Sequence, residues 1–340
     1  MRSQIRKISY EAPSNIALVK YWGKYGNQLP TNASVSFTLS QCKSIFEIEL
    51  FEKKENRATI DLEFEGIKNH SFVPKIQKLF DKIENEYTVV KDYDWQIKSS
   101  NTFPHSSGIA SSASSMACLA MCVDELQYGE IDIQRASMIA RIGSGSASRS
   151  VIPRLGWWGA HPTQALTSQE YAIPVWDEVD EVFHTYQNTI LIVHAGEKSV
   201  SSTAGHDLMN TNHYAQIRYQ NAYDNIVNLI GAMREGDLDR FGEIIEFEAM
   251  SLHALMMMSH PSFILLKPNT LNIIERIKSY RNETKLPVSF TLDAGPNIHL
   301  LYPQSITNEV EFWVDSELKQ FCENGLYIKD FVGDGPKKIG

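Results

Sequence analysis

The chain has 340 residues, of which 43% are hydrophobic and 21% charged, and its formal net charge is −9. This length accommodates two lobes or one large fused domain. The acidic balance, without a block of clustered Lys and Arg, argues against nucleic-acid binding. No apolar run approaches the ~18–20 residues needed to cross a bilayer, and no signal peptide is visible, so we expect no membrane partner.

The first half predicts strands followed by helices. Residues 58–65 alternate between apolar and polar, as in a half-buried strand. Residues 73–86 place four apolar side chains on one helical stripe. Strands are expected at 16–19, 34–40, 45–51, 58–65 and 95–99, and helices at 73–86, 109–126 and 133–142.

The second half repeats this mixture without a repeat, a low-complexity tract or a linker. Strands are expected at 189–194, 288–292, 298–302 and 326–331, and helices at 214–235, 238–247, 271–280 and 310–322. We therefore expect an α+β fold in two closely packed lobes, residues 1–188 and 189–340.

The cysteines show no metal-site spacing, and reduced thiols suit a cytoplasmic protein. Cys118 and Cys122 are four residues apart in a predicted helix, so they share a face and are expected to pack as small hydrophobic residues. His253 and His260 lack a third ligand motif and are expected to be structural. We predict no protein-held metal site.

Residues 104–113 (PHSSGIASSA) form a Ser- and Gly-rich loop that enters a helix. Unpaired N–H groups and the dipole at a helix start attract phosphate, and Gly108 permits close approach of the backbone. The GxxxxGK[ST] phosphate loop is absent. A plain helix N-cap explains the same residues equally well.

A second such loop, residues 143–150 (GSGSASRS), contains Arg149. A guanidinium can bind a carboxylate or phosphate through two parallel hydrogen bonds. The alternative is a flexible turn with a surface arginine. Two such loops in one chain favour a ligand with several anionic groups.

Residues 15–24 (NIALVKYWGK) predict a buried strand that ends in Lys20 and Lys24. One lysine after a buried run often only reaches to the rim. Two lysines at the end of a strand, with Gly23 between them, favour an anion site.

Asp293 lies in FTLDAGPN, directly after a predicted strand. Its carboxylate can act as a general base or position a hydroxyl. An Asp before Gly and Pro can equally be a turn cap. The local chemistry leaves both roles open.

Together and in this order, the segments NIALVKYWGK, LPTNASVSFTL, NTFPHSSGIASSAS, ARIGSGSASRS, KSVSSTAG and FTLDAGPN resemble the diphosphomevalonate decarboxylase family of the GHMP kinase superfamily. The resemblance spans residues 15–297. It implies the GHMP kinase fold, with an N-terminal ribosomal-protein-S5-like lobe that binds ATP, a C-terminal GHMP lobe and the active site in the cleft between them. It also implies a homodimer.

The resemblance assigns site residues by position. The catalytic residues it implies are Lys20, Arg149 and Asp293. Its substrate-binding positions match Asn15, Tyr21, Trp22, Gly23, Lys24, Ser144, Gly145, Ser146, Ala147, Ser148, Arg149, Ser202 and Thr203. Its ATP-binding positions match Asn101, Pro104, Ser106, Ser107, Gly108, Ser111 and Ser112.

The chain departs from the family pattern at three places. His105, Ser106 and Ser107 stand where Thr-Ala-Ala is usual, and we expect altered affinity there rather than loss of binding. His206 stands where Met is usual, and the segment 151–155 with Arg154 replaces a glycine-rich one. The last two changes are expected to affect which end groups the pocket prefers.

The implied activity is the conversion of (R)-5-diphosphomevalonate to isopentenyl diphosphate with ATP and Mg²⁺, in isoprenoid biosynthesis. The C3 hydroxyl is phosphorylated, and phosphate and CO₂ then leave. Asp293 orients or deprotonates the hydroxyl, and Lys20 keeps Asp293 ionised. The alternatives are a phosphomevalonate decarboxylase, a 3-kinase of the same fold, and a non-catalytic metabolite-binding relative.

Overall fold

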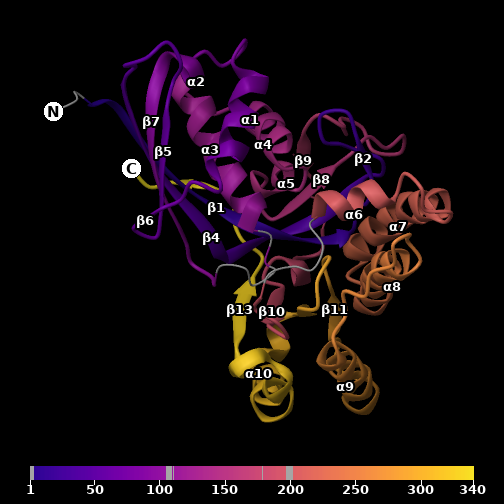
Figure 1. The fold of residues 1–340 in the computed structure, drawn as a ribbon. Helices are drawn as coiled ribbons and strands as arrows, with labels where there is room; N and C mark the ends of the chain where they lie inside the picture. The colour runs from indigo at the N-terminus through magenta and orange to yellow at the C-terminus, as the bar shows by residue number, and fades with distance from the viewer. Residues whose placement is uncertain (1–3, 105–108, 110, 178, 197–201) are drawn as a thin grey trace.

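The computed structural model describes residues 4–104, 109, 111–177, 179–196 and 202–340. Within them the chain forms one large sheet and one smaller sheet, each covered by helices (Figure 1). The large sheet belongs mainly to the first half of the chain and the smaller one to the second half. This is the α+β, two-lobed arrangement that the sequence predicts.

The large sheet has eight strands in the order β14-β1-β4-β7-β5-β6, with β8 pairing β4 and β9. All its pairs are antiparallel except β5 with β7. Its strands are β1 (Gln4–Val19), β4 (Ser34–Glu52), β5 (Ile60–Phe64), β6 (Ile67–Lys68), β7 (Tyr93–Asn101), β8 (Leu155–Trp158), β9 (Ala172–Pro174) and β14 (Lys337–Lys338). A separate hairpin, β2 (Lys24–Tyr25) with β3 (Leu29–Pro30), follows β1.

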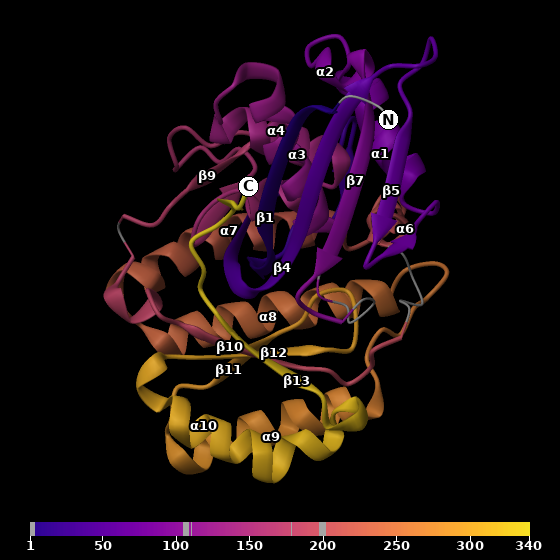
Figure 2. The same ribbon diagram turned by 90° about the vertical axis from the view of Figure 1, so that its left-hand side faces the viewer.

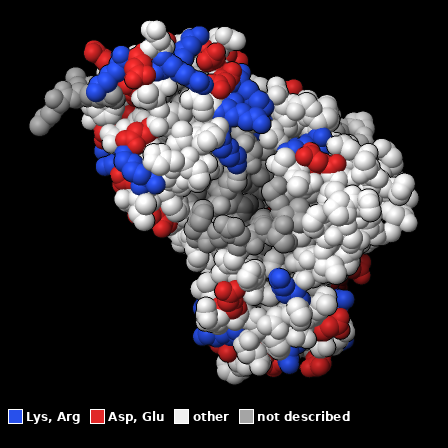
Figure 3. All heavy atoms as spheres, viewed as in Figure 1, with Lys and Arg blue, Asp and Glu red and all other residues white. Residues whose placement is uncertain are grey.

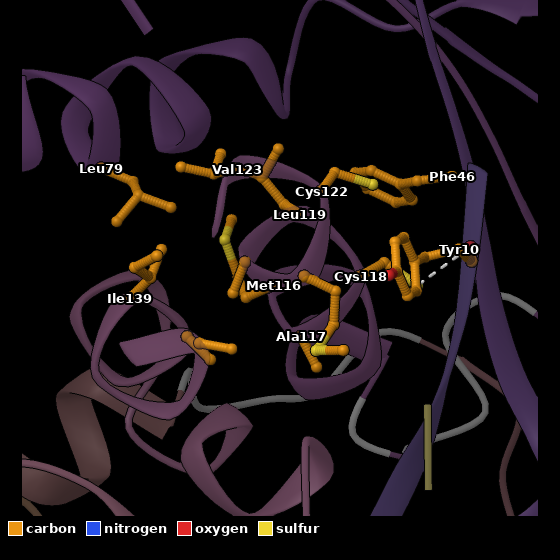
Figure 4. Close-up of a cluster of buried hydrophobic side chains, with 14 of the residues drawn as sticks. Tyr10, Phe46, Leu79, Met116, Ala117, Cys118, Leu119, Cys122, Val123 and Ile139 are labelled. Atoms are coloured by element: carbon orange, nitrogen blue, oxygen red, sulfur yellow. Dashed lines mark hydrogen bonds between the residues drawn. The ribbon is translucent and has the colours of Figure 1, made fainter. Parts of the chain in front are cut away.

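Helices cover one face of this sheet. They are α1 (Val73–Ile83), α2 (Val89–Asp92), α3 (Ser111–Tyr128), α4 (Ile133–Gly143) and α5 (Ala147–Ser150). Helix α3 packs between the sheet and α4, so it is buried on nearly every side, as a helix that is apolar all round must be. In Figure 4, Cys118 and Cys122 of α3 face Tyr10 and Phe46 of the sheet, which confirms that both thiols are core residues.

The smaller sheet is antiparallel, in the order β11-β12-β10-β13. Its strands are β10 (Gln187–Leu191), β11 (Ser289–Thr291), β12 (Ile298–Tyr302) and β13 (Tyr327–Phe331). The helices of this half are α6 (Ser202–Leu208), α7 (Ala215–Glu235), α8 (Leu238–Met257), α9 (Pro268–Thr284) and α10 (Thr307–Trp313). Helices α7 and α8 lie between the two sheets, and α9 and α10 cover the far face of the smaller sheet (Figure 2). Shorter turns are the 3-10 helices η1 (Glu181–Phe183), η2 (Gln304–Ile306), η4 (Lys319–Phe321) and η5 (Glu323–Gly325) and the π-helical turn η3 (Val314–Leu318).

The two halves share a core. Phe37 of β4 packs against Phe183 and Tyr186, which lie just before β10, and against Phe241 of α8. The buried Asp330 of β13 accepts hydrogen bonds from three successive backbone N–H groups of β4, at residues 40–42, each at 2.8 Å. The buried aromatic contacts of Phe37 and the three hydrogen bonds of Asp330 together make a rigid connection between the lobes.

The C-terminal tail returns to the first lobe. Leu39 bridges to Val332, and β14 pairs with β1 through Tyr10 and Glu11. The tail beyond β13 therefore belongs to the large sheet, which the predicted division at 188/189 does not anticipate. Such long-range pairing leaves no local pattern in the sequence.

The element positions mostly agree with the predictions, and the differences have tertiary causes. β12 has the predicted bounds, whereas α8 continues ten residues beyond the predicted end at 247. Its inward positions there include Glu248 and His253, which interrupt the apolar stripe. The predicted strands 34–40 and 45–51 are one strand, because Asp330 satisfies the backbone where the alternation is interrupted.

Among the described residues, no helix is both long and apolar enough to cross a membrane.

Candidate active site

The Lys20–Asp293 pair joins the two lobes. Lys20 follows the end of β1, and Asp293 follows β11. The Lys20 Nζ donates to Asp293 Oδ1 at 3.0 Å and to the Ala17 carbonyl at 2.6 Å. The Lys20 side chain is 2% exposed and that of Asp293 is 31% exposed. The ammonium is thus enclosed by protein, while the carboxylate remains accessible to a ligand.

Electrostatics tie the two groups to each other. Burial lowers the pKa of Lys20, and the neighbouring Asp293 opposes this shift. A buried ammonium keeps its proton only while an anion lies close by. Conversely, the Lys20 charge favours the ionised form of Asp293, which is the form that can accept a proton.

Arg149 lies beside this pair in a cradle of neutral oxygens. Its Nε donates to Ser36 Oγ at 3.0 Å, another nitrogen donates to the Ser34 hydroxyl, and a third donates to Asn15 Oδ1 at 3.3 Å. The side chain is 2% exposed, and burial lowers the pKa of Arg149 to about 10. Among the described residues Arg149 forms no ion pair with a carboxylate. A buried guanidinium left without a counter-ion attracts an anionic ligand.

Asn15 holds this arrangement in place. Its amide nitrogen donates to Ser150 Oγ at 2.7 Å and to the Ser146 carbonyl at 3.0 Å, while its oxygen accepts from Arg149. Asn15 is itself buried. Asn15 therefore fixes the orientation of Arg149 and of the loop before α5.

The loop after β1 and the Gly-rich loop before α5 touch through Tyr21. A Cβ at Gly145 would lie 2.5 Å from Tyr21 Oη, so only glycine permits this approach. The Tyr21 ring also contacts Trp158 edge-on, with centroids 4.9 Å apart. Burial raises the pKa of Tyr21 to about 12, so its hydroxyl remains a hydrogen-bond donor at neutral pH.

His206 of α6 occupies the space between Tyr21 and Trp22. Its ring stacks on Tyr21 at 4.5 Å and lies tilted against Trp22 at 4.5 Å. Burial, together with Lys24 and Arg149, lowers the pKa of His206 to about 3. The ring is therefore neutral, and because Nδ1 accepts from the Gly23 N–H at 2.9 Å, the proton is on Nε2.

The start of α3 is supported by a lysine that sequence reasoning missed. Lys75 of α1 donates to the Ser112 hydroxyl, and burial lowers the pKa of Lys75 to about 8, with Lys24 contributing. Burial lowers the pKa of Lys24, and Lys78 and Lys82 add to this shift. Lys75, Lys78 and Lys82 have i, i+3, i+7 spacing, so they share one helical face, a signal that was available in the sequence.

The space-filling view in Figure 3 shows a hollow on this face of the molecule, with Lys and Arg side chains at its upper edge. Such a distribution draws in anionic ligands and suits phosphate groups.

Several predicted positions contribute in other ways. Ala147 is buried in the core, and the Ser148 hydroxyl donates to the Gly145 carbonyl at 2.8 Å, so their side chains face inward. At the end of β7, the side-chain oxygen Oδ1 of Asn101 accepts from the Ser44 hydroxyl of β4 at 2.7 Å. Thr203 is exposed, with Oγ1 3.5 Å from Lys24 Nζ.

Other predicted positions give less. Ser144 and Ser146 are half-buried at the Gly-rich loop, Ser111 begins α3, and Pro104 is exposed. His105, Ser106, Ser107 and Gly108 lie outside the described residues, as does the side chain of Ser202. Arg154 contacts Asp334 and the Trp176 ring, so of the two pocket departures only His206 lies beside the site residues.

The described residues contain no group of three or more His, Cys, Asp or Glu side chains that could hold a metal ion. His253 Nε2 lies 3.1 Å from the Asp293 carbonyl, so this histidine supports the turn that carries the acid. A metal ion that acts here would be held chiefly through ligand phosphates, as Mg²⁺ often is.

This geometry defines the class of the protein: an enzyme whose inter-lobe cleft offers one accessible acid and several cations to a multiply anionic small molecule. Residues 12–169 match the family model described as diphosphomevalonate decarboxylase-like N-terminal domain, and residues 188–331 match the mevalonate 5-diphosphate decarboxylase C-terminal domain. A diphosphomevalonate decarboxylase of Danio rerio is 30% identical over 319 residues, which cover 86% of this chain and 75% of the relative. The chain therefore belongs to the diphosphomevalonate decarboxylase family.

Solved structures agree with this assignment. The mevalonate diphosphate decarboxylase from Staphylococcus aureus is 27% identical, with a TM-score of 0.87 and 98% of both chains covered. A structure of MDDEF in complex with MVAPP, AMPPCP and magnesium is 24% identical, with a TM-score of 0.82, and 98% of this chain and 99% of that chain are covered. The second likeness is one of fold.

Proposed function

We propose that this protein catalyses the ATP-dependent decarboxylation of (R)-5-diphosphomevalonate to isopentenyl diphosphate, ADP, phosphate and CO₂. The observation that carries the proposal is the Lys20–Asp293 pair, closed by a 3.0 Å hydrogen bond, beside the buried Arg149. One accessible carboxylate next to two enclosed cations suits a 3-hydroxy acid, in which the hydroxyl is on C3 and the carboxylate is attached to the neighbouring C2.

The chain's own residues divide the work. Asp293 accepts the proton of the C3 hydroxyl as its oxygen is phosphorylated, and Lys20 stabilises the ionised acid. Arg149 binds the substrate carboxylate and holds it until the C–C bond breaks. Electrons of that bond form the new double bond as phosphate leaves from C3. Tyr21 and Lys24 hold the far end of the substrate.

The nucleotide end lies at the start of α3. ATP supplies the phosphoryl group, and Mg²⁺ neutralises charge on its phosphates. Ser111 and Ser112 begin α3, where free N–H groups suit phosphate, and Lys75 adds a nearby cation. The predicted ATP positions Asn101 and Pro104 lead into the same segment. MDDEF, with MVAPP, AMPPCP and magnesium bound, supports this pairing of ligands in the shared fold.

The finer assignments belong to the proposal. The predicted substrate and ATP residues act as a group in the cleft, except that Asn15, Ala147 and Ser148 support it from within. The division into lobes falls near residues 188/189 apart from the C-terminal tail, and the protein acts as a homodimer in the cytoplasm. The two family models, over residues 12–169 and 188–331, support the lobe division. The family resemblance implies the homodimer, and free, buried cysteines suit the cytoplasm.

The test measures ADP and CO₂ release side by side, with 5-diphosphomevalonate and 5-phosphomevalonate as alternative substrates. We expect equal amounts of ADP and CO₂ with the diphosphate and little of either with the monophosphate. ADP without CO₂ would indicate a 3-kinase, and preference for the monophosphate would indicate a phosphomevalonate decarboxylase. Release of neither product would support a non-catalytic relative.

A further inference from the structure

The main-chain N–H and carbonyl of Lys20 form hydrogen bonds with a buried ion pair of the second lobe, Arg218 with Glu248. The Lys20 N–H donates to Glu248 Oε2 at 2.9 Å, and the Lys20 carbonyl accepts from an Arg218 terminal nitrogen at 2.8 Å. Arg218 lies on α7 and Glu248 on α8. The carbonyl also accepts from Asn32 Nδ2 at 3.0 Å, but Arg218 and Glu248 hold both main-chain polar groups of Lys20 from the second lobe.

The ion pair is held by several hydrogen bonds, although Arg218 Nε is buried without a partner among the described residues. Arg218 binds Glu248 through two hydrogen bonds, of 2.9 Å and 2.6 Å, and Asn225 donates to Glu248 Oε1 at 2.7 Å. The two side chains of the pair are 2% and 0% exposed. Fork-like pairing in a dry environment fixes orientation as well as distance. A peptide bound to it has little freedom to shift.

The other end of Lys20 reaches the acid. Its Nζ bonds Asp293 Oδ1 and the Ala17 carbonyl, so the side chain is held at the ammonium and the backbone at the peptide. Helix α8 also contributes His253, which contacts the Asp293 carbonyl at 3.1 Å. The same helix thus contacts the main chain of both members of the Lys20–Asp293 pair.

We propose that the Arg218–Glu248 pair is a positioning device that sets the distance between the Lys20 ammonium and the Asp293 carboxylate for catalysis. The inference rests on the proposed function, because it assigns these two residues a role in that reaction. Neither residue touches the substrate. Their effect passes through the Lys20 peptide, where a displacement of about 1 Å is expected to cost about 100-fold in rate.

The test replaces the pair with apolar residues of similar volume, Arg218→Met with Glu248→Leu. Such a double replacement removes both charges together and generally preserves the fold, whereas a single replacement leaves a charge buried. We expect kcat to fall about 100-fold while KM for both substrates stays within about threefold, because binding groups remain but the reacting geometry is lost. Unfolding temperature is measured on the same samples.

The matched control is the Arg135–Asp124 pair, replaced as Arg135→Met with Asp124→Leu. Asp124 is likewise fully buried, binds Arg135 at 2.7 Å and accepts from a backbone N–H, that of Asp132, at 2.8 Å. It lies in the C-terminal half of α3, away from the helix start. We expect a change in unfolding temperature and an unchanged kcat.

Arg218→Lys provides a second variant that keeps the charge. An ammonium is a point donor and cannot bind Glu248 twice while also reaching the Lys20 carbonyl, so we expect a loss in kcat on the order of tenfold. The inference is overturned if the folded double variant, or Arg218→Lys where the double variant does not fold, keeps kcat within about threefold of wild type. An equal loss of kcat in the control pair overturns it as well. If the wild-type protein releases no CO₂, the proposed function is wrong, and this inference, which rests on it, is wrong as well.

Discussion

Replacing Asp293 by Asn removes one negative charge and keeps the side-chain volume. In the structure this charge lies 3.0 Å from the Lys20 ammonium, an interaction of about 5 kcal/mol at an effective dielectric constant of about 20. Without it, burial and the nearby Arg149 lower the pKa of Lys20 further, opposed by Glu248, and the ammonium is less stable. The variant thus lacks the proton acceptor and weakens the adjacent cation.

The expected loss follows from both effects. General-base catalysis contributes about 10²- to 10⁴-fold, and we expect kcat to fall about 10³- to 10⁴-fold, or about 4 to 5 kcal/mol in the activation barrier. The Arg149 cradle and the loop after β1 are untouched, so substrate affinity should change by less than about threefold.

The assay compares kcat from coupled ADP release with the dissociation constant of diphosphomevalonate from isothermal titration. Asp61→Asn is the control, because it breaks a Lys–Asp pair with Lys68 that lies half-exposed on the surface. That variant should retain wild-type kcat. A kcat for Asp293→Asn within about tenfold of wild type would refute the assigned role.

Three further predictions concern titration and exposure. The pKa of Lys75 near 8 means that its ammonium is lost as pH rises through this value, so KM for ATP should increase between pH 7 and 9, and Lys75→Gln should have a high KM with a flatter profile. The pKa values of His206, His253 and His299 are lowered by burial to about 3, 4 and 4. Below an unfolded pKa of about 6.5 the unfolded chain therefore binds up to three more protons, and the free energy of unfolding should fall by up to about 4 kcal/mol per pH unit as pH drops towards 4. Urea titrations at pH 7, 6 and 5 measure this slope, which His299→Gln should reduce; a slope that is flat in wild type contradicts it. All four cysteines are buried, so Ellman's reagent should label none quickly until denaturant is added, and rapid native labelling would contradict this burial, which Figure 4 shows for Cys118 and Cys122.

Local sequence patterns predicted most of the elements. β12 has the predicted bounds because apolar side chains dominate it, and α7 ends at the predicted residue 235, followed by Gly236, whose φ of +66° suits a helix terminus. The strand end at Lys20, the Gly-rich loop with Arg149 and the turn with Asp293 were each identified as candidates, because particular residue types follow buried runs there. Their roles remained open locally, and only the family resemblance favoured catalysis.

Other features could not be read from local patterns. Lys75 was missed although its spacing with Lys78 and Lys82 was visible, since a lysine face on a helix is ordinarily a solvated one. Arg154 was expected at the pocket but contacts Asp334 and Trp176, because neighbours in sequence need not face the same way. The second half of α8 was missed because its inward polar residues find partners from distant segments.

The sequence by itself determined the α+β class, the order of the elements and the residue types available for chemistry, since apolar periodicity and turn chemistry are local. Tertiary structure alone decided that Lys20 meets Asp293, 273 positions later, that Arg149 lies buried in neutral oxygens, and that Arg218 and Glu248 hold the Lys20 peptide. Charges and hydrogen-bond donors act over a few ångströms, so their effect depends on which distant segments the core brings together. The packing of the two lobes sets the distances between these charged and hydrogen-bonding groups, and no local sequence pattern encodes them.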